Sequence, residues 1–170
     1  DPLETLPVEA MYDEAKGSLQ GGNLGRATRY YQRLIARFPY GAYTEQSQLE
    51  LAYAQYKAGD SEEASSTIDR FIRTYPTHRN IDYAYYLKGL ANFNDQPNAF
   101  ERLFSGRNLS ARDPRGMRDA YDTFRELVER FPQSRYAADA RNRMLYLVNY
   151  LAMSEINVAR FYYGRRAYVA

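Results

Sequence analysis

The sequence predicts an all-α protein, built as a right-handed α-solenoid of stacked helical hairpins. The first observation is a recurring spacing, in which an alanine is followed twelve residues later by a proline that itself follows an aromatic residue. Proline disfavours a helical residue before it and cannot continue the helical hydrogen-bond ladder, so each such proline marks the end of a helix. Three pairs share this spacing: Ala27 with Pro39, Ala64 with Pro76, and Ala120 with Pro132.

The second observation is a small residue on the helix that precedes each of these alanines. Ala15, Ala52 and Gly89 follow one another at intervals of 37 residues, and a small side chain there lets the two helices of a hairpin approach closely. Glycine-containing turns at 21–23 and 59–60 separate the two helices of the first two units. This arrangement resembles the tetratricopeptide repeat, whose period is about 34 residues, and such units must stack to bury their apolar faces.

We expect a single domain over residues 1–170, made of three repeats and the start of a fourth. The last two Ala–Pro pairs are 56 rather than 37 residues apart, so the third repeat carries 19 extra residues at 95–113. This insertion is expected to be a loop, with one or two helical turns possible at 99–104. A functional loop and a solvated crossover both remain open. The expected units are 8–39, 43–76, 80–132 and 134–170.

The first two hairpins contain four expected helices, after an extended segment at residues 1–7. Gly-Gly-Asn ends the first helix, and the aromatic–Pro pair at 38–39 ends the second. Thr44 is a candidate N-cap of the third helix. Ser61 begins the fourth, where two following glutamates favour the positive end of the helix dipole. The expected ranges are 8–20, 24–38, 43–58 and 61–75.

Three further helices are expected in the rest of the chain. Asn80 is a candidate cap for the fifth, Asp113 before Pro114 for the sixth, and Ser134 for the seventh. The expected ranges are 81–94, 114–131, and 135 to 160 or 163, with Gly164 ending the last. That helix is longer than a repeat helix, and the apolar residues 168–170 are not the polar cap that a solenoid needs. We therefore expect a solenoid truncated at its C-terminus.

Composition and charge exclude several functional classes. The formal net charge of +2 gives no reason to expect a nucleic-acid partner, and the absence of cysteine excludes disulfides and thiolate zinc sites. No apolar run is long enough for a transmembrane helix, and no signal segment is visible. The chain begins at Asp1, without methionine, so we expect a trimmed N-terminus. The cations are nearly all arginine, which suits protein or peptide partners.

No set of residues in the sequence is typical of an enzyme, a metal site or a cofactor site. His78 is the single histidine, and we expect it to brace the turn in which it stands. Carboxylates such as Asp119, Asp122, Glu126 and Glu129 recur at helical spacing, which is typical of solvated helix faces. There is no P-loop, dinucleotide fingerprint, paired-histidine metal helix or nucleophile elbow.

The repeat pattern predicts a peptide-binding groove along the first helices of the hairpins. Counting helix positions from the small residues gives a tyrosine-rich surface flanked by lysines, which suits an extended peptide with aromatic side chains and a free carboxylate. Some of these tyrosines could instead pack between hairpins. The candidate groove residues are Tyr12, Lys16, Tyr53, Tyr56, Lys57, Tyr83, Tyr86, Phe93 and Asn94.

Several motifs go beyond a generic repeat. Arg-Phe-Pro-Tyr-Gly at 37–41, Ile-Asp-Arg-Phe-Ile-Arg at 68–73, Pro-Thr-His at 76–78 and Asn-Ile-Asp-Tyr at 80–83 stand in order. Arg-Asp-Pro at 112–114, Phe-Pro-Gln-Ser at 131–134 and Ala-Tyr-Val-Ala at 167–170 follow. From about residue 8 onward, the chain resembles the BamD family, the tetratricopeptide lipoproteins of the β-barrel assembly (BAM) machinery of the Gram-negative outer membrane.

The resemblance implies a non-enzymatic subunit that helps to fold and insert outer-membrane β-barrel proteins. In the family, a lipid on an N-terminal cysteine anchors the protein at the periplasmic face of the outer membrane; this chain lacks that cysteine. The partners implied are the periplasmic domains of BamA, the other BAM lipoproteins, and the C-terminal segments of unfolded outer-membrane proteins. The alternative is a purely structural tetratricopeptide scaffold of a periplasmic envelope complex, without direct substrate binding. A cell-wall hydrolase is disfavoured because no catalytic set is present.

Overall fold

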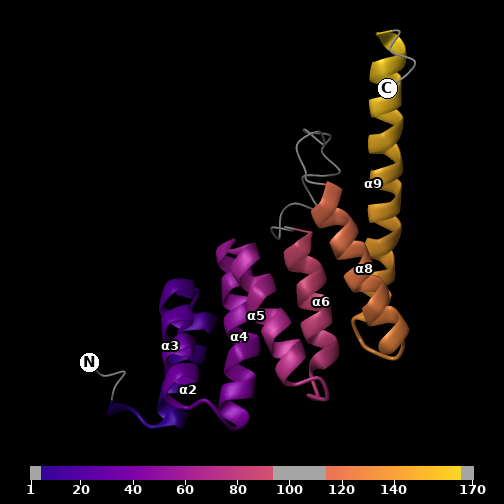
Figure 1. Ribbon diagram of the computed structural model, residues 1–170. Coiled ribbons are helices and arrows are strands. Elements are labelled where there is room, and N and C mark those ends of the chain that lie inside the picture. Colours follow the sequence, from indigo (N-terminus) through magenta and orange to yellow (C-terminus); the bar gives the residue numbers. More distant parts are fainter. Residues whose placement is uncertain (1–4, 94–113, 166–170) are drawn as a thin grey trace.

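The structure, a computed structural model, describes residues 5–93 and 114–165, which form α-helices and contain no strand. The first three helical pairs lie side by side, and a long last helix follows them (Figure 1). The elements are α2 (Val8–Gln20), α3 (Leu24–Arg37), α4 (Ala42–Ala58), α5 (Ser61–Thr74), α6 (Ile81–Asn92), α8 (Pro114–Arg130) and α9 (Ala137–Gly164).

Each helix packs chiefly against its neighbours in sequence, which is the arrangement of stacked hairpins. The helices form the pairs α2/α3, α4/α5 and α6/α8, and α9 follows them. Of the contacts between helices that are not neighbours in this order, the most extensive are those of α2 with α4 and of α4 with α6. The first helices of the hairpins therefore share one side of the stack.

The predicted helix ends agree with the structure to within about two residues, but the predicted cap at Thr44 is wrong. The N-cap of α4 is Gly41, whose φ of 113° lies in the region that favours glycine. Thr44 is fully buried, and its hydroxyl donates a hydrogen bond to the carbonyl oxygen of Phe38. It ties the start of α4 to the end of α3 instead of capping α4.

The cap predicted at Ser134 is also misplaced, because Tyr136 occupies the N-cap position of α9. The Ser134 hydroxyl accepts a hydrogen bond from the Tyr136 amide at 3.2 Å and donates one to Asp82 Oδ2 at 2.6 Å. Asn80 does occupy the N-cap position of α6, although its side chain makes no capping hydrogen bond. Asp113, Asn94 and the insertion at 95–113 lie outside the described residues.

The small residues do allow close helix packing, as predicted. Ala15, Ala27, Ala52, Ala64 and Ala120 are all fully buried. The third hairpin is the tightest: a Cβ added to Gly89 would lie 2.4 Å from Cε1 of Phe124, whose ring is itself fully buried. Real Cβ atoms do not approach another carbon that closely, so α6 and α8 can meet here only through glycine.

A polar cluster joins α6 to the start of α9. The ring of Tyr86 stacks on that of Tyr136 with centroids 4.9 Å apart, and its hydroxyl donates to Asp139 Oδ2 at 2.7 Å. Arg143 Nε donates to the same oxygen at 2.6 Å. Burial and the bond to Asp139 raise the pKa of Tyr86 to about 12. Burial acts to raise the pKa of Asp139, but the bonds from Tyr86 and Arg143 outweigh it and hold that pKa below its usual value.

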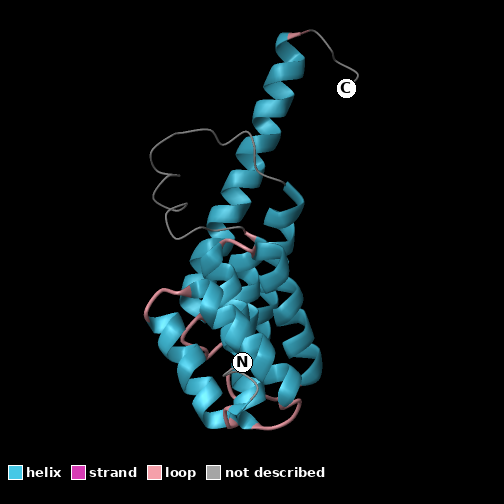
Figure 2. Cartoon of the chain, turned by 90° about the vertical axis from the view of Figure 1, so that its left-hand side faces the viewer, coloured by secondary structure: helices cyan, strands magenta, loops and turns pink. Residues whose placement is uncertain are grey.

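The C-terminal half of α9 projects beyond the other helices in both views (Figures 1 and 2). Large apolar side chains on it are exposed, including Met153, Phe161 and Tyr163. The predicted length of this helix is confirmed, and Gly164 is its last residue. Within residues 5–93 and 114–165, no helix combines the length and the apolar composition needed to cross a membrane.

We expect Gly89→Ala to lower the free energy of unfolding by about 1–3 kcal/mol, because the added methyl group overpacks the Phe124 ring. Urea unfolding followed by circular dichroism measures this change. Gly17→Ala is the matched control: Gly17 also lies within a helix, but no atom stands within 4 Å of its added Cβ. The control should gain up to about 1 kcal/mol from helix propensity. Equal stability of the two variants would contradict the close approach of α6 and α8.

We expect Asp139→Asn to lower the free energy of unfolding by about 0.5–1 kcal/mol near neutral pH, because the half-exposed carboxylate binds Arg143 and Tyr86. The folded pKa of Asp139 lies below its unfolded value, so the stabilisation is complete above about pH 4 and is lost as the pH falls through the folded pKa. Urea unfolding at about pH 7 and about pH 3 should show that the loss of stability caused by Asp139→Asn is smaller at the lower pH. Asp13→Asn, at an exposed position of α2, is the control. A penalty independent of pH would refute the assignment.

Candidate peptide-binding groove

A groove with a volume of about 460 Å³ lies on the side of the stack where the first helices of the hairpins meet. Side chains from α2, α4, α6, the turn before α6 and the segment before α9 line it. Its size falls within the range of about 300–1,000 Å³ that is usual for ligand sites in proteins. A surface built from successive repeats is also the surface that a solenoid offers to an extended ligand.

Three tyrosines form the aromatic wall of this groove: Tyr53 from α4, Tyr83 from α6 and Tyr136 from the start of α9. The rings of Tyr83 and Tyr136 pack at 5.4 Å between centroids. Burial raises the pKa of Tyr83 well above its ordinary value. Leu49, which is buried, also lines the groove. The wall therefore offers apolar area with polar tips, which suits a peptide.

The two carboxylates of the groove are occupied by neutral donors. Glu50 accepts hydrogen bonds from Tyr12 at 2.7 Å, from Gln46 at 2.8 Å and from Tyr31. Burial, followed by these bonds to Glu50, raises the pKa of both tyrosines above the ordinary value. The second carboxylate, at Asp82, accepts from the Ser134 hydroxyl and from a backbone amide of α6.

The cationic side chains of the groove, unlike its two carboxylates, are exposed. Lys16, Arg79 and Arg135 line it, and all three side chains are exposed. Lys16 Nζ lies 5.6 Å from the centroid of the Tyr12 ring, and the Arg135 guanidinium lies 5.0 Å from that of Tyr136. In the part of the chain that the structure describes, none of the three pairs with a carboxylate.

A second hollow, of about 660 Å³, adjoins the groove at the turn between α5 and α6. Tyr12, Tyr43 and Tyr75 line it, and Gln46 and Arg79 line both spaces. The Tyr12 and Tyr43 rings lie 5.3 Å apart, and Tyr43 is 38% exposed. The groove and this hollow together form a surface that continues from α2 to the start of α9.

The turn beside this hollow is braced by His78, as predicted. Its Nδ1 accepts a hydrogen bond from the Asn80 amide at 3.1 Å, and its ring packs edge-on against Phe71 at 5.2 Å. Its Nε2 lies 3.8 Å from a carboxylate oxygen of Glu45. No group of residues in the described ranges, 5–93 and 114–165, is arranged to hold a metal ion.

The structure brings together only some of the predicted groove residues. Lys16, Tyr53 and Tyr83 line the groove, and Tyr12 lines the adjoining hollow. Tyr56 and Lys57 line neither space, and Tyr86 packs against Tyr136 at the start of α9. Asn94 lies outside the described residues. Phe93 is only 6% exposed and packs on Tyr146, so it belongs to the core and not to an open wall.

Counting helix positions missed Arg79, Arg135 and Tyr136. All three stand in the turns before α6 and α9, whereas the repeat pattern assigns groove positions only within helices. The sequence did contain one sign that these residues belong to the groove. Each turn precedes the first helix of a hairpin, so the residues of both turns lie at the same end of the stack.

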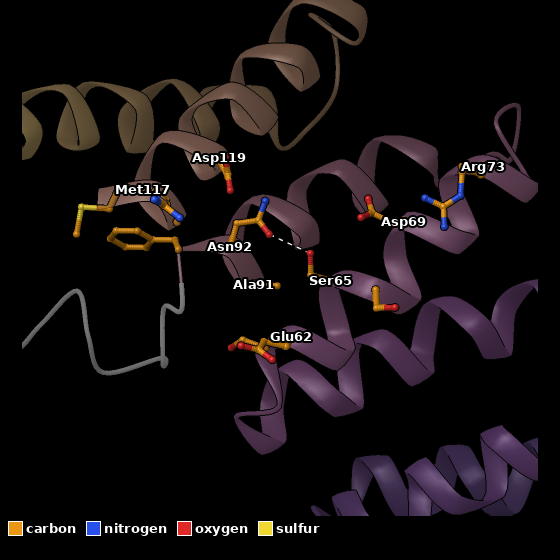
Figure 3. Close-up of a pocket in the computed structure, with 13 residues that line it drawn as sticks. Glu62, Ser65, Asp69, Arg73, Ala91, Asn92, Met117 and Asp119 are labelled. Atoms are coloured by element: carbon orange, nitrogen blue, oxygen red, sulfur yellow. Dashed lines mark hydrogen bonds between the residues drawn. The ribbon is translucent and has the colours of Figure 1, made fainter. Parts of the chain in front are cut away.

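A third hollow lies elsewhere, between α5, α6 and α8 (Figure 3), with a volume of about 880 Å³. Ser65 and Asn92 face one another across it, joined by a hydrogen bond of 3.0 Å. Its charges are mixed, because Asp69, Asp119 and Arg73 all line it. It has no aromatic wall other than buried Phe93, so it lacks the features expected of the peptide groove.

A comparison with solved structures supports the fold. The TPR domain of Arabidopsis OM64 superposes with a TM-score of 0.57 over 86% of this chain and 98% of that domain, at 16% sequence identity. At that identity the likeness concerns the fold alone. It confirms the predicted all-α, tetratricopeptide-like architecture.

Sequence comparisons are closer. The outer membrane protein assembly factor BamD of Xylella fastidiosa (strain 9a5c) is 49% identical over 165 residues, which are 97% of this chain and 56% of that protein. BamD of Neisseria meningitidis serogroup B is 47% identical, over 96% of this chain and 61% of its own length. BamD of Vibrio cholerae is 38% identical, over the whole chain and 70% of its own length.

The chain thus spans little more than half the length of the Xylella and Neisseria relatives. The family model YfiO, described as "Outer membrane lipoprotein", matches residues 4–170, almost the entire chain. These matches confirm the resemblance found in the motifs, and the chain belongs to the YfiO family of outer membrane lipoproteins, together with the BamD assembly factors.

Proposed function

We propose that this chain is a non-enzymatic part of the machinery that assembles outer-membrane proteins, and that it receives targeting segments of unfolded β-barrel precursors. Its relatives are named outer membrane protein assembly factors, which supports this role. The full-length protein acts at the periplasmic face of the outer membrane, where a lipid anchors it. The periplasmic domains of BamA and the other BAM lipoproteins are its partners in the complex.

The observation that carries the proposal is the groove with its wall of three tyrosines. Side chains of an extended peptide point alternately to opposite sides, so every second side chain can pack on the wall formed by Tyr53, Tyr83 and Tyr136. The amide side chains of Gln20 and Gln46 in the same groove can pair with the peptide backbone. The unfolded precursor of a β-barrel supplies segments with this alternation of apolar and polar residues.

The alternative, a purely structural scaffold, differs in what occupies the groove. A photo-crosslinking residue at position 53, in the full-length lipid-anchored protein, reports the occupant directly because Tyr53 lines the groove. Adducts with newly synthesised β-barrel precursors support reception. Adducts exclusively with other subunits of the complex support scaffolding and would overturn the proposed receiving role.

We expect Tyr53→Ala to weaken binding of a peptide from the C-terminal end of a β-barrel protein by about 1–3 kcal/mol, because the groove loses part of its aromatic wall. Isothermal titration calorimetry measures the change. Tyr40→Ala is the matched control: Tyr40 is 89% exposed and lines neither the groove nor the adjoining hollow. An unchanged affinity of Tyr53→Ala, with the control also unchanged, would show that the peptide does not bind in the groove.

A further inference from the structure

We propose that Arg79, supported by Arg135 and Lys16, binds the terminal carboxylate of the received peptide. We place the aromatic side chain of its last residue in the hollow lined by Tyr12, Tyr43 and Tyr75. The proposal rests on the function proposed above and specifies how the peptide ends and in which direction it lies. It goes beyond the aromatic wall, because it assigns roles to turn residues and to a second space.

Arg79 lies where the two spaces join, since it lines both the groove and the hollow. It stands in the turn before α6 and is exposed, so its guanidinium can approach either space. Arginine offers donors in a planar fork that matches a carboxylate with two parallel hydrogen bonds. A peptide whose terminal carboxylate meets Arg79 therefore has its last side chain beside the hollow and its preceding residues in the groove.

The charges around Arg79 favour an anion. Arg135 and Lys16 line the same groove, and, like Arg79, they pair with no carboxylate in the described part of the chain. The carboxylates that line the groove with them, Glu50 and Asp82, already accept bonds from hydroxyl and amide donors. Glu45, which lines the adjoining hollow with Arg79, has an oxygen 3.8 Å from Nε2 of His78. Three cations thus face the groove while the lone pairs of its two acids are directed to neutral groups, so an incoming carboxylate finds unused donors.

The backbone adds to this preference. The groove is lined by residues at the starts of two helices: Asn80 and Asp82 at α6, and Tyr136 at α9. The N-terminal end of a helix carries a partial positive charge that stabilises nearby anions. Both helices begin at the side where Arg79 and Arg135 stand, so the dipoles and the side chains act in the same direction.

The adjoining hollow has the chemistry of an aromatic subsite. Its tyrosines come from α2, α4 and the end of α5, and the Tyr12 ring is held in place by the bond between its hydroxyl and Glu50. The Tyr12 and Tyr43 rings are tilted by 57° at 5.3 Å, an arrangement that leaves ring faces and edges for a further aromatic group. Its volume of about 660 Å³ accommodates a phenylalanine or tyrosine side chain.

The test compares two forms of one peptide on the chain and its variants. The peptide has about ten residues that alternate apolar and polar, ends in phenylalanine, and carries either a free terminal carboxylate or a terminal amide. Fluorescence anisotropy gives the dissociation constants. We expect amidation to weaken binding about tenfold, the scale of a lost charge-assisted bond. On Arg79→Gln, most of this preference should be lost, because only the supporting cations Arg135 and Lys16 remain.

Arg73→Gln is the matched control, because Arg73 is also exposed and lines the separate hollow between α5 and α8. It should retain the tenfold preference for the free carboxylate. Arg135→Gln provides a second variant and should reduce the preference without abolishing it. Circular dichroism of each variant checks that the helices are intact.

The outcomes separate this inference from the function on which it rests. If both peptide forms bind the unchanged chain equally, and Tyr53→Ala still weakens them, the carboxylate assignment is wrong and the receiving role stands. If a peptide with an internal aspartate and an amidated end shows the same dependence on Arg79, the carboxylate comes from a side chain, which also overturns the terminal assignment. If neither form binds, the proposed function itself fails. Replacing the last phenylalanine by alanine should weaken binding to the unchanged chain but not to Tyr43→Ala.

Discussion

The close approach of helices at small residues is the constraint on which the rest of this structure depends. In the third hairpin there is no room for a single carbon atom between Gly89 and the ring of Phe124. Because this contact fixes the rotation of α6 about its own axis, it also fixes where the tyrosines of that helix lie. Tyr83 lies in the groove and Tyr86 against α9, although both are on the same helix. A packing requirement on one face of α6 therefore determines which side chains line the groove on another.

The tyrosines of this chain serve as core residues, as links between helices and as groove walls, and their surroundings decide which. Tyr31 is fully buried, and its hydroxyl can be buried only because Glu50 accepts a hydrogen bond from it. The same carboxylate holds Tyr12 at the edge of the groove, so one acid satisfies a core residue and orients a surface residue. Glu50 is thereby occupied by neutral donors, which leaves the cations of the groove without an acidic partner. The Glu50 carboxylate thus permits the burial of Tyr31 and also leaves the groove with unpaired positive charge.

The sequence was sufficient to predict the helices and their pairing, because proline, glycine and small residues act locally on the backbone. The sequence was less informative where contacts between residues far apart in the chain decide which residue caps a helix or lines the groove. Thr44 has the chemistry of a cap, but α4 begins earlier, with Gly41 at the N-cap in a positive-φ conformation. The Thr44 hydroxyl instead donates a hydrogen bond to the Phe38 carbonyl at the end of α3. Phe93 stands at a groove position by counting, yet it is buried against Tyr146 of the unusually long α9. Arg79 and Arg135 lie in different turns and line the same groove only because their helices begin at the same end of the stack.

The side on which the groove lies follows from how the hairpins pack. Contacts between first helices, α2 with α4 and α4 with α6, are more extensive than any between second helices, so the first helices lie closest together. Packed helices are about 8–10 Å apart, and side chains on one face of an extended strand repeat about every 7 Å. A strand that crosses the first helices therefore presents roughly one side chain to each of them. In the proposed complex, successive hairpins would therefore contact successive alternate residues of the peptide.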